Sequence, residues 1–255
     1  FMTETAWNAD VILPASAHAE KTGTYTNTNR QVQIGRAVVE PPKEVRQDWW
    51  IIQEIAKRMG LGWDYKSPKD IFDEMKLVMP SLDNISWERL EKDNHVTYPV
   101  KSELIPGEDI IFTDGFPTSN NLAKIIPVNL INPNDELNSD FPLILSTGRL
   151  LEHWHTGTMT RRAVVLNELE PDPMIFMSQV DSNFYNLDLN KSVIIETRRG
   201  KISIKIRHDD DLLPGMIFLP FCFKEAAANI LTNSDLDPIG KIPELKFSAA
   251  RVYQN

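Results

Sequence analysis

The segment from Phe141 to Arg162 constrains the fold most, because a short apolar run changes abruptly there into a long polar stretch. The apolar run, 141–145, is bounded by turn-forming residues, which predicts a buried strand. The polar stretch contains too many hydrogen-bond donors to serve as simple packing, since each buried donor needs a partner. Its glycines allow close backbone approach, and its hydroxyls, amides and arginines can donate to phosphate. The pattern predicts a strand followed by an anion-binding loop.

Local charge supports an anionic ligand. Residues 147–162 carry three arginines and one glutamate, a local charge of +2, whereas the whole chain carries −9. A positive segment in an acidic chain is a stronger indication of an anion site than any single residue. The alternative for Arg161 and Arg162 is that both are solvated surface charges. For Arg149, which follows a glycine directly after a strand, we favour ligand binding.

The overall composition excludes several other classes of protein. With 255 residues, the chain can bury a proper core and form one large domain or two smaller ones. Net charge −9 argues against nucleic acid and anionic membrane surfaces as partners. No apolar run reaches the length of a membrane span, and no signal segment is evident. The single cysteine, Cys222, excludes an internal disulfide and indicates a reducing, cytoplasmic compartment.

The first part of the chain predicts a mixture of strands, helices and loops. We expect a short buried strand at 9–13, ended by Pro14, and then a solvated loop at 18–33. Helical periodicity with capping residues predicts helices at 48–59, 68–78 and 86–90. A long connection over 99–140 follows, in which we expect one or two short strands, with 110–112 and 124–128 as candidate apolar runs, and a linker at 132–140.

From 141 onward the pattern is short strands and turns, typical of a compact barrel. Further strands are expected at 174–177, 192–197, 201–207 and 216–223, with the second and third forming a hairpin around Arg199 and Gly200. The three alanines at 226–228 favour a helical turn. Asn229 and Thr232 would then share a face, where they either read the edge of a heterocycle or cap the turn. Lys246 is either a phosphate or carbonyl contact or a surface lysine.

No motif indicates that this chain carries catalytic or metal-binding groups of its own. His153 and His155 lack the third ligand of a recognisable metal site, and Cys222 lies in an apolar run typical of an inert, buried thiol. The chain also lacks a nucleophile elbow and the glycine-rich loops of mononucleotide and dinucleotide sites. We therefore expect no catalytic residue and no metal ligand here.

Three motifs give the chain a specific resemblance: TGR-x₃-HWHTGTMTRR, the segment Phe221–Asn229, and DPIGKIPELKFSAARV. Together they resemble the C-terminal part of the molybdopterin oxidoreductase family, most closely the catalytic (alpha) subunits of cytoplasmic formate dehydrogenases. The resemblance implies a mixed α/β part at 1–140, which would be the end of the α/β oxidoreductase domain with a helical connector and linker. It implies a mainly β domain at 141–255, a six-stranded double-psi β-barrel that binds a molybdopterin dinucleotide.

The resemblance also implies which residues hold the cofactor, bis-molybdopterin guanine dinucleotide with molybdenum or tungsten. The segment 18–33 is similar to a family element near the cofactor, which adds two residues to those of the barrel. The implied cofactor-binding residues are Thr147, Gly148, Arg149, His153, His155, Thr156, Thr158, Asn229, Leu231, Thr232, Lys246, Asn27 and Arg30.

The implied reaction is the two-electron oxidation of formate to carbon dioxide, with electrons passing through iron–sulfur clusters to iron–sulfur or flavin subunits. The cluster ligands and the substrate-handling residues of the family would lie in several hundred residues upstream of Phe1, so this fragment alone should be inactive. Two alternatives stay open. One is an assimilatory nitrate reductase with the same cofactor site, and the other is a scaffold subunit that keeps the fold without the cofactor.

Overall fold

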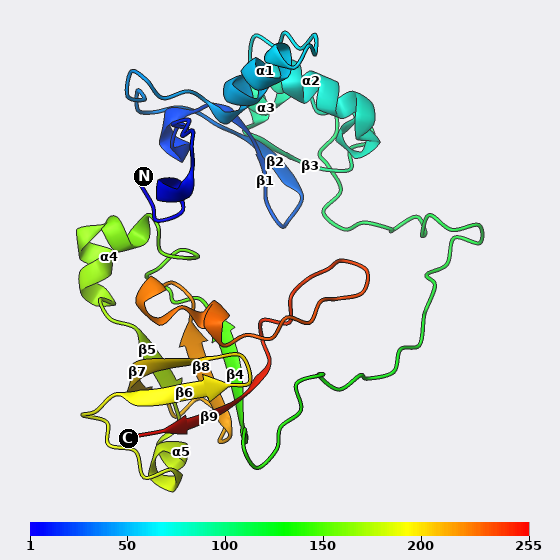
Figure 1. The fold of residues 1–255 in the computed structure, drawn as a ribbon. Helices are drawn as coiled ribbons and strands as arrows, with labels where there is room; N and C mark the ends of the chain where they lie inside the picture. Colours follow the sequence, from blue (N-terminus) through cyan, green and yellow to red (C-terminus); the bar gives the residue numbers. More distant parts are fainter. Residues whose placement is uncertain (255) are drawn as a thin grey trace. The chain divides into compact units, whose positions relative to one another are not determined.

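The computed structural model describes residues 1–254, and they form two compact units (Figure 1). One unit comprises Glu4–Pro127, and the other comprises Phe1–Thr3 with the chain from Val128 onward. The two units divide between Pro127 and Val128, and the extended segment 128–142 belongs to the second unit. The domain boundary that the sequence predicts at 140/141 stays a prediction. No helix among residues 1–254 is long and apolar enough to cross a membrane.

The Glu4–Pro127 unit has a three-stranded antiparallel sheet, in the order β1-β2-β3, together with three helices. Its core gathers Phe72, Ile85, Leu90 and Val32, all buried. This confirms the expected mixed α/β character of the first part. The elements are β1 (Gly23–Thr26), β2 (Gln31–Gly35), α1 (Asp48–Arg58), α2 (Pro68–Val78), α3 (Trp87–Asp93) and β3 (His95–Thr97).

Side-chain caps explain where two helices begin. The Oγ of Ser67 accepts a hydrogen bond from the Asp70 amide, and the Asp70 carboxylate accepts one from the Ser67 amide at 3.1 Å. Pro68 occupies the first helical position, where its missing N–H costs nothing. Ser86 caps α3 by accepting from the Arg89 amide at 3.1 Å. The predicted starts of both helices are confirmed.

Three expectations for this unit are wrong. Residues 18–33 are not wholly loop, since β1 and most of β2 lie there, and Arg30, with φ 63°, closes the turn between them. Residues 9–13 form no strand, and the pairing next to them is an isolated parallel bridge between Ala15 and Arg46. The apolar runs 110–112 and 124–128 are also unpaired.

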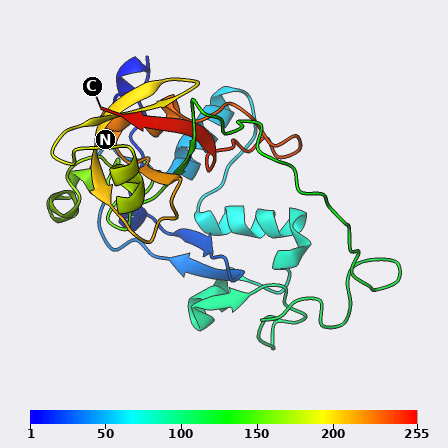
Figure 2. The same ribbon diagram turned by 90° about the horizontal axis from the view of Figure 1, so that it is seen from below.

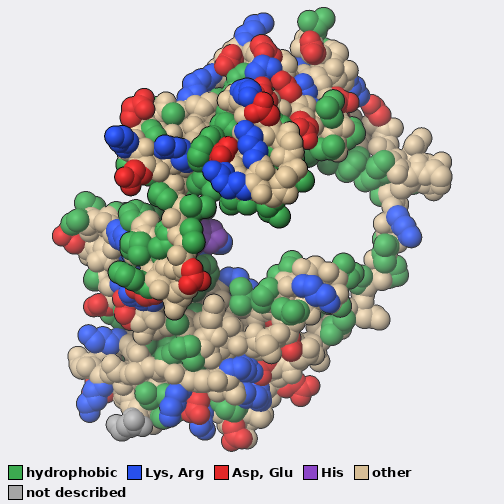
Figure 3. Space-filling model, turned by 45° about the horizontal axis from the view of Figure 1, so that its top comes forward, with side chains coloured by type: hydrophobic (Ala, Val, Ile, Leu, Met, Phe, Trp, Pro, Cys, Tyr) green, Lys and Arg blue, Asp and Glu red, His purple; other side chains and the backbone are tan. Residues whose placement is uncertain are grey.

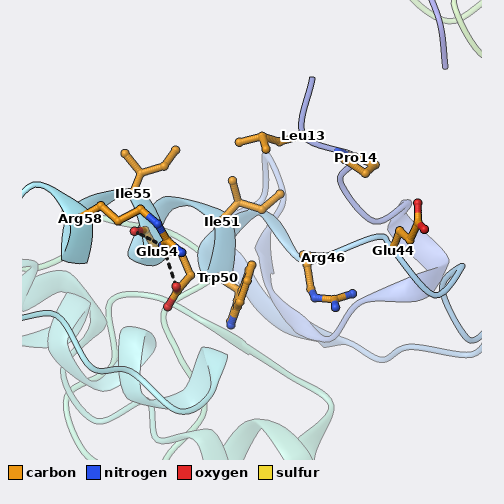
Figure 4. Close-up of a pocket in the computed structure, with 9 residues that line it drawn as sticks. All are labelled: Leu13, Pro14, Glu44, Arg46, Trp50, Ile51, Glu54, Ile55 and Arg58. Atoms are coloured by element: carbon orange, nitrogen blue, oxygen red, sulfur yellow. Dashed lines mark hydrogen bonds and ion pairs between the residues drawn. The ribbon is translucent and has the colours of Figure 1, made fainter. Parts of the chain in front are cut away.

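The apolar face of helix α1 is largely exposed, although its helical periodicity predicts that this face packs in a core. Ile52 and Met59 are 56% and 75% exposed, and only Gln53 and Ala56 are buried. Its outer surface borders a cavity of about 470 Å³, shown in Figure 4, whose wall carries Trp50. The remaining lining residues are Leu13, Pro14, Glu44, Arg46, Ile51, Glu54, Ile55 and Arg58.

The second unit is a closed six-stranded barrel with strand order β4-β8-β5-β7-β6-β9, which confirms the expected mainly β domain. Alternate side chains of β6 and β7 point into one apolar core, as period-two patterning requires. The strands are β4 (Leu143–Gly148), β5 (Met174–Met177), β6 (Val193–Thr197), β7 (Lys201–His208), β8 (Met216–Pro220) and β9 (Ser248–Tyr253).

Short helices connect the barrel strands. The expected helical turn near the three alanines is a pair of 3-10 turns, Lys224–Ala226 and Ala228–Ile230. Helices α4 (Val164–Leu169) and α5 (Gln179–Phe184) and the last strand, β9, were not anticipated from the sequence. Another 3-10 turn spans Thr160–Arg162.

The face of the molecule shown in Figure 3 has no dominant charge. In Figure 3 basic and acidic side chains are intermixed over the visible surface, with apolar side chains between them. The net charge of −9 is therefore not gathered on that face. Figure 2 shows the barrel from below, with β9 running across it.

Candidate functional site

The barrel brings the two segments that carry most of the predicted cofactor-binding residues to one end. Strands β4 and β8 are parallel neighbours, with Gly148 in register with Pro220. Their carboxyl ends therefore lie side by side, and both arrowheads point to the same end of the barrel in Figure 1. The loop 149–163 leaves from β4 and the segment 221–233 leaves from β8. The topology thus places the predicted anion-binding loop beside the predicted Asn229 segment.

A third segment joins this end of the barrel through Thr147, which is buried at the end of β4. Its Oγ1 donates a hydrogen bond to the carbonyl of Leu245 at 2.7 Å. Lys246 donates from Nζ to the carbonyl of Thr147. These bonds bring together two predicted cofactor-binding residues that lie 99 positions apart in the sequence.

Gly148 makes a close approach that no other residue would allow. A Cβ at this position would lie 2.4 Å from the ring of Phe218 and 3.7 Å from Nζ of Lys246. The carbonyl of Gly148 accepts a hydrogen bond from the Phe221 amide at 3.1 Å. The glycine therefore lets β4 end flush against β8, with its backbone close to the lysine.

Arg149 lies exposed directly after the strand, with its guanidinium 5.7 Å from the centre of the Phe221 ring. Its Nη2 lies 3.5 Å from Nδ1 of His155, whose backbone takes a positive φ of 48°. Trp154 packs edge-on against His155, with 4.6 Å between ring centroids. Two predicted ligands are thereby brought together at an accessible position, where both can still donate to an anion.

His153 is placed differently from the other predicted ligands, because it is buried. Its Nε2 lies 2.7 Å from the carbonyl of Glu170, and its Nδ1 lies 3.3 Å from Oγ1 of Thr160. That hydroxyl also accepts a hydrogen bond from the Trp154 amide at 3.1 Å. Both ring nitrogens of His153 are thus engaged within the chain, and its visible role is to shape the loop.

The two threonines of the HTGT motif lie close together on the loop, with 3.4 Å between their Oγ1 atoms. Thr156 is exposed and Thr158 is half-buried. Gly157 between them has a φ of +73°, a conformation that favours glycine. The pair therefore presents two hydroxyls from one tight turn.

In the segment after β8, Asn229 is exposed on the second 3-10 turn and the Thr232 hydroxyl lies 3.5 Å from its carbonyl. Leu231 is fully buried, and its carbonyl accepts a hydrogen bond from Oγ1 of Thr197 at 2.9 Å. The amide of Asn229 is accessible, whereas Leu231 anchors the segment in the barrel core.

Asn27 and Arg30 belong to the Glu4–Pro127 unit. The side-chain Nδ2 of Asn27 donates a hydrogen bond to Oε1 of Gln31 at 2.8 Å. The Arg30 guanidinium donates to the carbonyls of Tyr98 and Asp109, the latter at 2.7 Å. Both side chains therefore support the β1–β2 turn and its neighbouring loop.

The donor chemistry of the barrel end fits a phosphorylated, hydrogen-bonding ligand. Hydroxyls, an accessible arginine and a lysine lie at this end of the barrel, and the segment after β8 adds an exposed amide. The missing Cβ of Gly148 makes room for the Phe218 ring. Cys222 is buried nearby, and burial raises the pKa of its thiol to about 11. Among residues 1–254, no group of three or more His, Cys, Asp or Glu side chains is placed to hold a metal ion.

Sequence reasoning missed the contacts that hold the two loops together. Arg161 forms an ion pair with Glu225, with 2.7 Å between Nη1 and Oε2, and stacks on Phe223. Partial burial of Glu225 acts to raise its pKa, but the hydrogen bond from Arg161 keeps the pKa below its usual value. No sequence signal links these positions, because they are separated by 64 residues.

Comparison with known proteins identifies both parts of the chain. Residues 143–249 match the family model described as Molydopterin dinucleotide binding domain, and residues 1–58 match that of Molybdopterin oxidoreductase. Acetylene hydratase from Pelobacter acetylenicus has a similar fold, with a TM-score of 0.73 at 21% identity. The match covers 100% of this chain and 39% of that one.

Curated relatives cover nearly all of this sequence. The F420-dependent formate dehydrogenase subunit alpha of Methanocaldococcus jannaschii is 42% identical over 254 residues, which is 99% of this chain and 38% of that protein. Subunit alpha of the F420-dependent formate dehydrogenase 2 of Methanococcus maripaludis is 38% identical over 255 residues, or 99% and 37%. This chain therefore spans less than two fifths of the length of these relatives. The barrel, its two neighbouring polar loops and these matches together show that the chain belongs to the molybdopterin oxidoreductase family.

Proposed function

We propose that this chain forms the dinucleotide-holding part of a formate dehydrogenase that uses a bis-molybdopterin guanine dinucleotide with molybdenum or tungsten. When bound, the cofactor supplies the two-electron oxidation of formate to carbon dioxide, and the protein supplies binding and orientation. The observation that carries the proposal is the convergence of the loop after β4, the segment after β8 and Lys246 at one end of the barrel. The names of the curated relatives support formate as the substrate.

Each group of residues has a proposed role. Arg149, His155, Thr156 and Thr158 bind the pyrophosphate, because they offer charge-assisted and hydroxyl donors on an exposed turn. Gly148 is a proposed backbone contact of the cofactor, beside Nζ of Lys246. Asn229 reads the edge of the guanine or pterin, since an amide both donates and accepts.

The other predicted residues act less directly in this proposal. Lys246 contacts a phosphate or carbonyl of the cofactor from its position beside Thr147. Leu231 and Thr232 carry Asn229, while His153 shapes the loop. Asn27 and Arg30, on the β1–β2 turn of the Glu4–Pro127 unit, remain proposed cofactor-binding residues.

The proposal also covers the whole enzyme. The electrons pass through an iron–sulfur cluster to an iron–sulfur or flavin partner subunit. Because two relatives are named as F420-dependent, F420 is the first electron acceptor to test. The single cysteine is the basis for proposing a cytoplasmic location, which cell fractionation would check.

The test uses the enzyme produced in full from its own gene, with Arg149→Ala and Asn229→Ala as separate variants. Molybdenum, tungsten and guanine nucleotide are measured per polypeptide after denaturation. We expect both variants to lose nucleotide relative to wild type. Arg36→Ala and Asn183→Ala are the controls, because both residues are exposed and lie outside the polar loops. Wild-type nucleotide content in both Arg149 and Asn229 variants would refute the assignment, and turnover of nitrate but not formate would refute the substrate.

A further inference from the structure

The loop after β4 holds successive residues of the segment after β8. Arg149 lies against the ring of Phe221, and His153 packs edge-on against Phe223 with 5.6 Å between ring centroids. Gly157 abuts the backbone of Cys222, since a Cβ on the glycine would lie 2.9 Å from that carbonyl oxygen. We call residues 221–225 the clasped segment. These contacts join the loop after β4 to the segment after β8, which the parallel pairing of β4 and β8 by itself only places side by side.

Arg161 makes the most extensive of these contacts. Its guanidinium carbon lies 4.8 Å from the centre of the Phe223 ring, and its Nη1 lies 2.7 Å from Oε2 of Glu225. Its Nε is buried and has no hydrogen-bond partner, and the whole side chain is only 19% exposed. Arg161 is therefore not a solvated surface charge.

The backbone of the loop is shaped for this arginine. The Arg161 amide donates to the carbonyl of Gly157 at 2.9 Å. A Cβ on Gly157 would lie 2.7 Å from Cγ of Arg161, so only glycine leaves room for the arginine stem there. The same glycine lies between Thr156 and Thr158, whose hydroxyls face one another. Arg161 thus packs beneath the turn that presents the two hydroxyls.

We propose that Arg161 is a positioning residue for the dinucleotide, acting through Phe223 and Glu225. Its ion pair and ring stacking fix the Thr156–Thr158 turn relative to the clasped segment, which leads directly into Asn229. This inference rests on the proposed function, because it assumes that the turn and Asn229 grip one ligand. Arg161 is not itself the phosphate ligand, since the Glu225 carboxylate already neutralises its guanidinium.

The experiment is a double-mutant cycle in the full enzyme with Arg161→Gln, Glu225→Gln and both together. Arg251→Gln is the control, because this arginine also pairs with a carboxylate, that of Glu196 at 2.8 Å, and also lies over an aromatic ring, but it belongs to β9, outside the loop and the clasped segment. Two quantities are measured: hydrogen exchange of the amides in 149–163, and the rate at which bound guanine nucleotide is lost on incubation. Arg161→Lys is included because lysine can keep the ion pair without the flat stacking surface.

We expect each single variant to lose nucleotide roughly five times faster than wild type, with faster amide exchange in 149–163 and unchanged exchange in β6 and β7. The double variant should be no worse than either single variant, because both changes remove the same contact. Arg161→Lys should restore part of the nucleotide retention, and the control Arg251→Gln should retain nucleotide as the wild type does.

Two results would overturn the inference while leaving the proposed function in place. In the first, wild type holds the nucleotide and both single variants match it in retention and exchange. In the second, Arg161→Gln loses nucleotide but Glu225→Gln does not, which would make Arg161 a direct ligand. A wild-type enzyme without guanine nucleotide would instead refute the proposed function, so the two failures are distinguishable.

Discussion

Lys246 and Thr147 are hydrogen-bonded to each other across 99 residues of sequence, with the lysine Nζ donating to the threonine carbonyl. The Thr147 hydroxyl makes a second hydrogen bond to the same segment, donating to the carbonyl of Leu245, the residue before the lysine. This reciprocal pair ties the end of β4 to the chain that leads into β9. It therefore holds one side of the proposed cofactor site in place before any ligand binds.

The first prediction concerns the buried half of this pair. Thr147→Val keeps the side-chain shape but removes the hydroxyl, which leaves the Leu245 carbonyl without that donor. We expect the free energy of unfolding to fall by about 1–2 kcal/mol. Lys246→Met should cost less, about 0.5 kcal/mol, because the lysine is exposed and water can replace its donor. Urea unfolding curves measure both changes.

The matched control for the lysine is Lys205→Met, because Lys205 is an exposed residue of β7. It should leave the unfolding midpoint unchanged. If Thr147→Val were as stable as wild type, the hydroxyl contact would contribute nothing and the tie would have to reside elsewhere.

Short sequence patterns predicted several strands of the barrel and two helix starts of the other unit. The apolar run predicted β4, although the strand continues three residues beyond 145, to Gly148, because Ser146 and Thr147 also pair with β8. Arg199-Gly200 marks the turn between β6 and β7. Ser67 and Ser86 mark helix starts because a cap depends on residues three positions apart. Such features are readable because all the interacting residues lie within one short window of sequence.

Longer-range features could not be read in this way. Strand β9 pairs with β4 and β6, far upstream, so its pairing depends on barrel closure and not on its own sequence. The periodicity of α1 indicates an apolar face but not what covers it, and Ile52 is exposed. At the site, the role of His153 depends on Glu170 and that of Arg161 on Glu225. The resemblance supplied candidate ligands, while the structure supplied the contacts that position them.

The second prediction concerns Cys222, which we do not regard as a metal ligand. Its side chain is buried, and burial raises the pKa of the thiol to about 11. The thiol therefore stays protonated at pH 8, and only the thiolate reacts with iodoacetamide. We expect very slow labelling of the folded protein and ordinary labelling in urea, measured by mass spectrometry.

Because Cys222 is the single cysteine, any label on the protein reports this site alone. Cys222→Ala should leave the metal content of the full enzyme unchanged and cost about 1 kcal/mol of stability through the small cavity. Rapid labelling of the folded protein at pH 8, or loss of metal in Cys222→Ala, would contradict this interpretation.

The third prediction concerns Asp135, which anchors the extended segment before β4 to the barrel. Its carboxylate accepts hydrogen bonds from Arg198, from Arg199 at 2.5 Å and from the Ala249 amide at 2.7 Å. Burial acts to raise the pKa of Asp135, but these hydrogen bonds outweigh it and leave the pKa below its usual value. The charged carboxylate is thus stabilised by folding.

The sign of the pH dependence follows from that direction. A depressed pKa in the folded state gives stability that is fully present above the unfolded pKa, about 3.9, and is lost as pH falls through the folded value. Asp135→Asn should therefore lower the free energy of unfolding at pH 7 by about 2 kcal/mol. The expected loss of stability is smaller than the usual cost of breaking a buried ion pair, because Arg198 and Arg199 are partly exposed and solvent screens their charges.

Urea unfolding of wild type and Asp135→Asn between pH 7 and pH 3 separates this ion pair from a general packing defect. The stability difference should stay constant down to about pH 4 and then shrink, because protonated wild-type Asp135 resembles the neutral variant. The exposed Asp172→Asn is the matched control and should leave the curve unchanged at every pH. A difference that persists undiminished at pH 3 would mean that Asp135 anchors the segment by shape and hydrogen bonding alone, without a contribution from its charge.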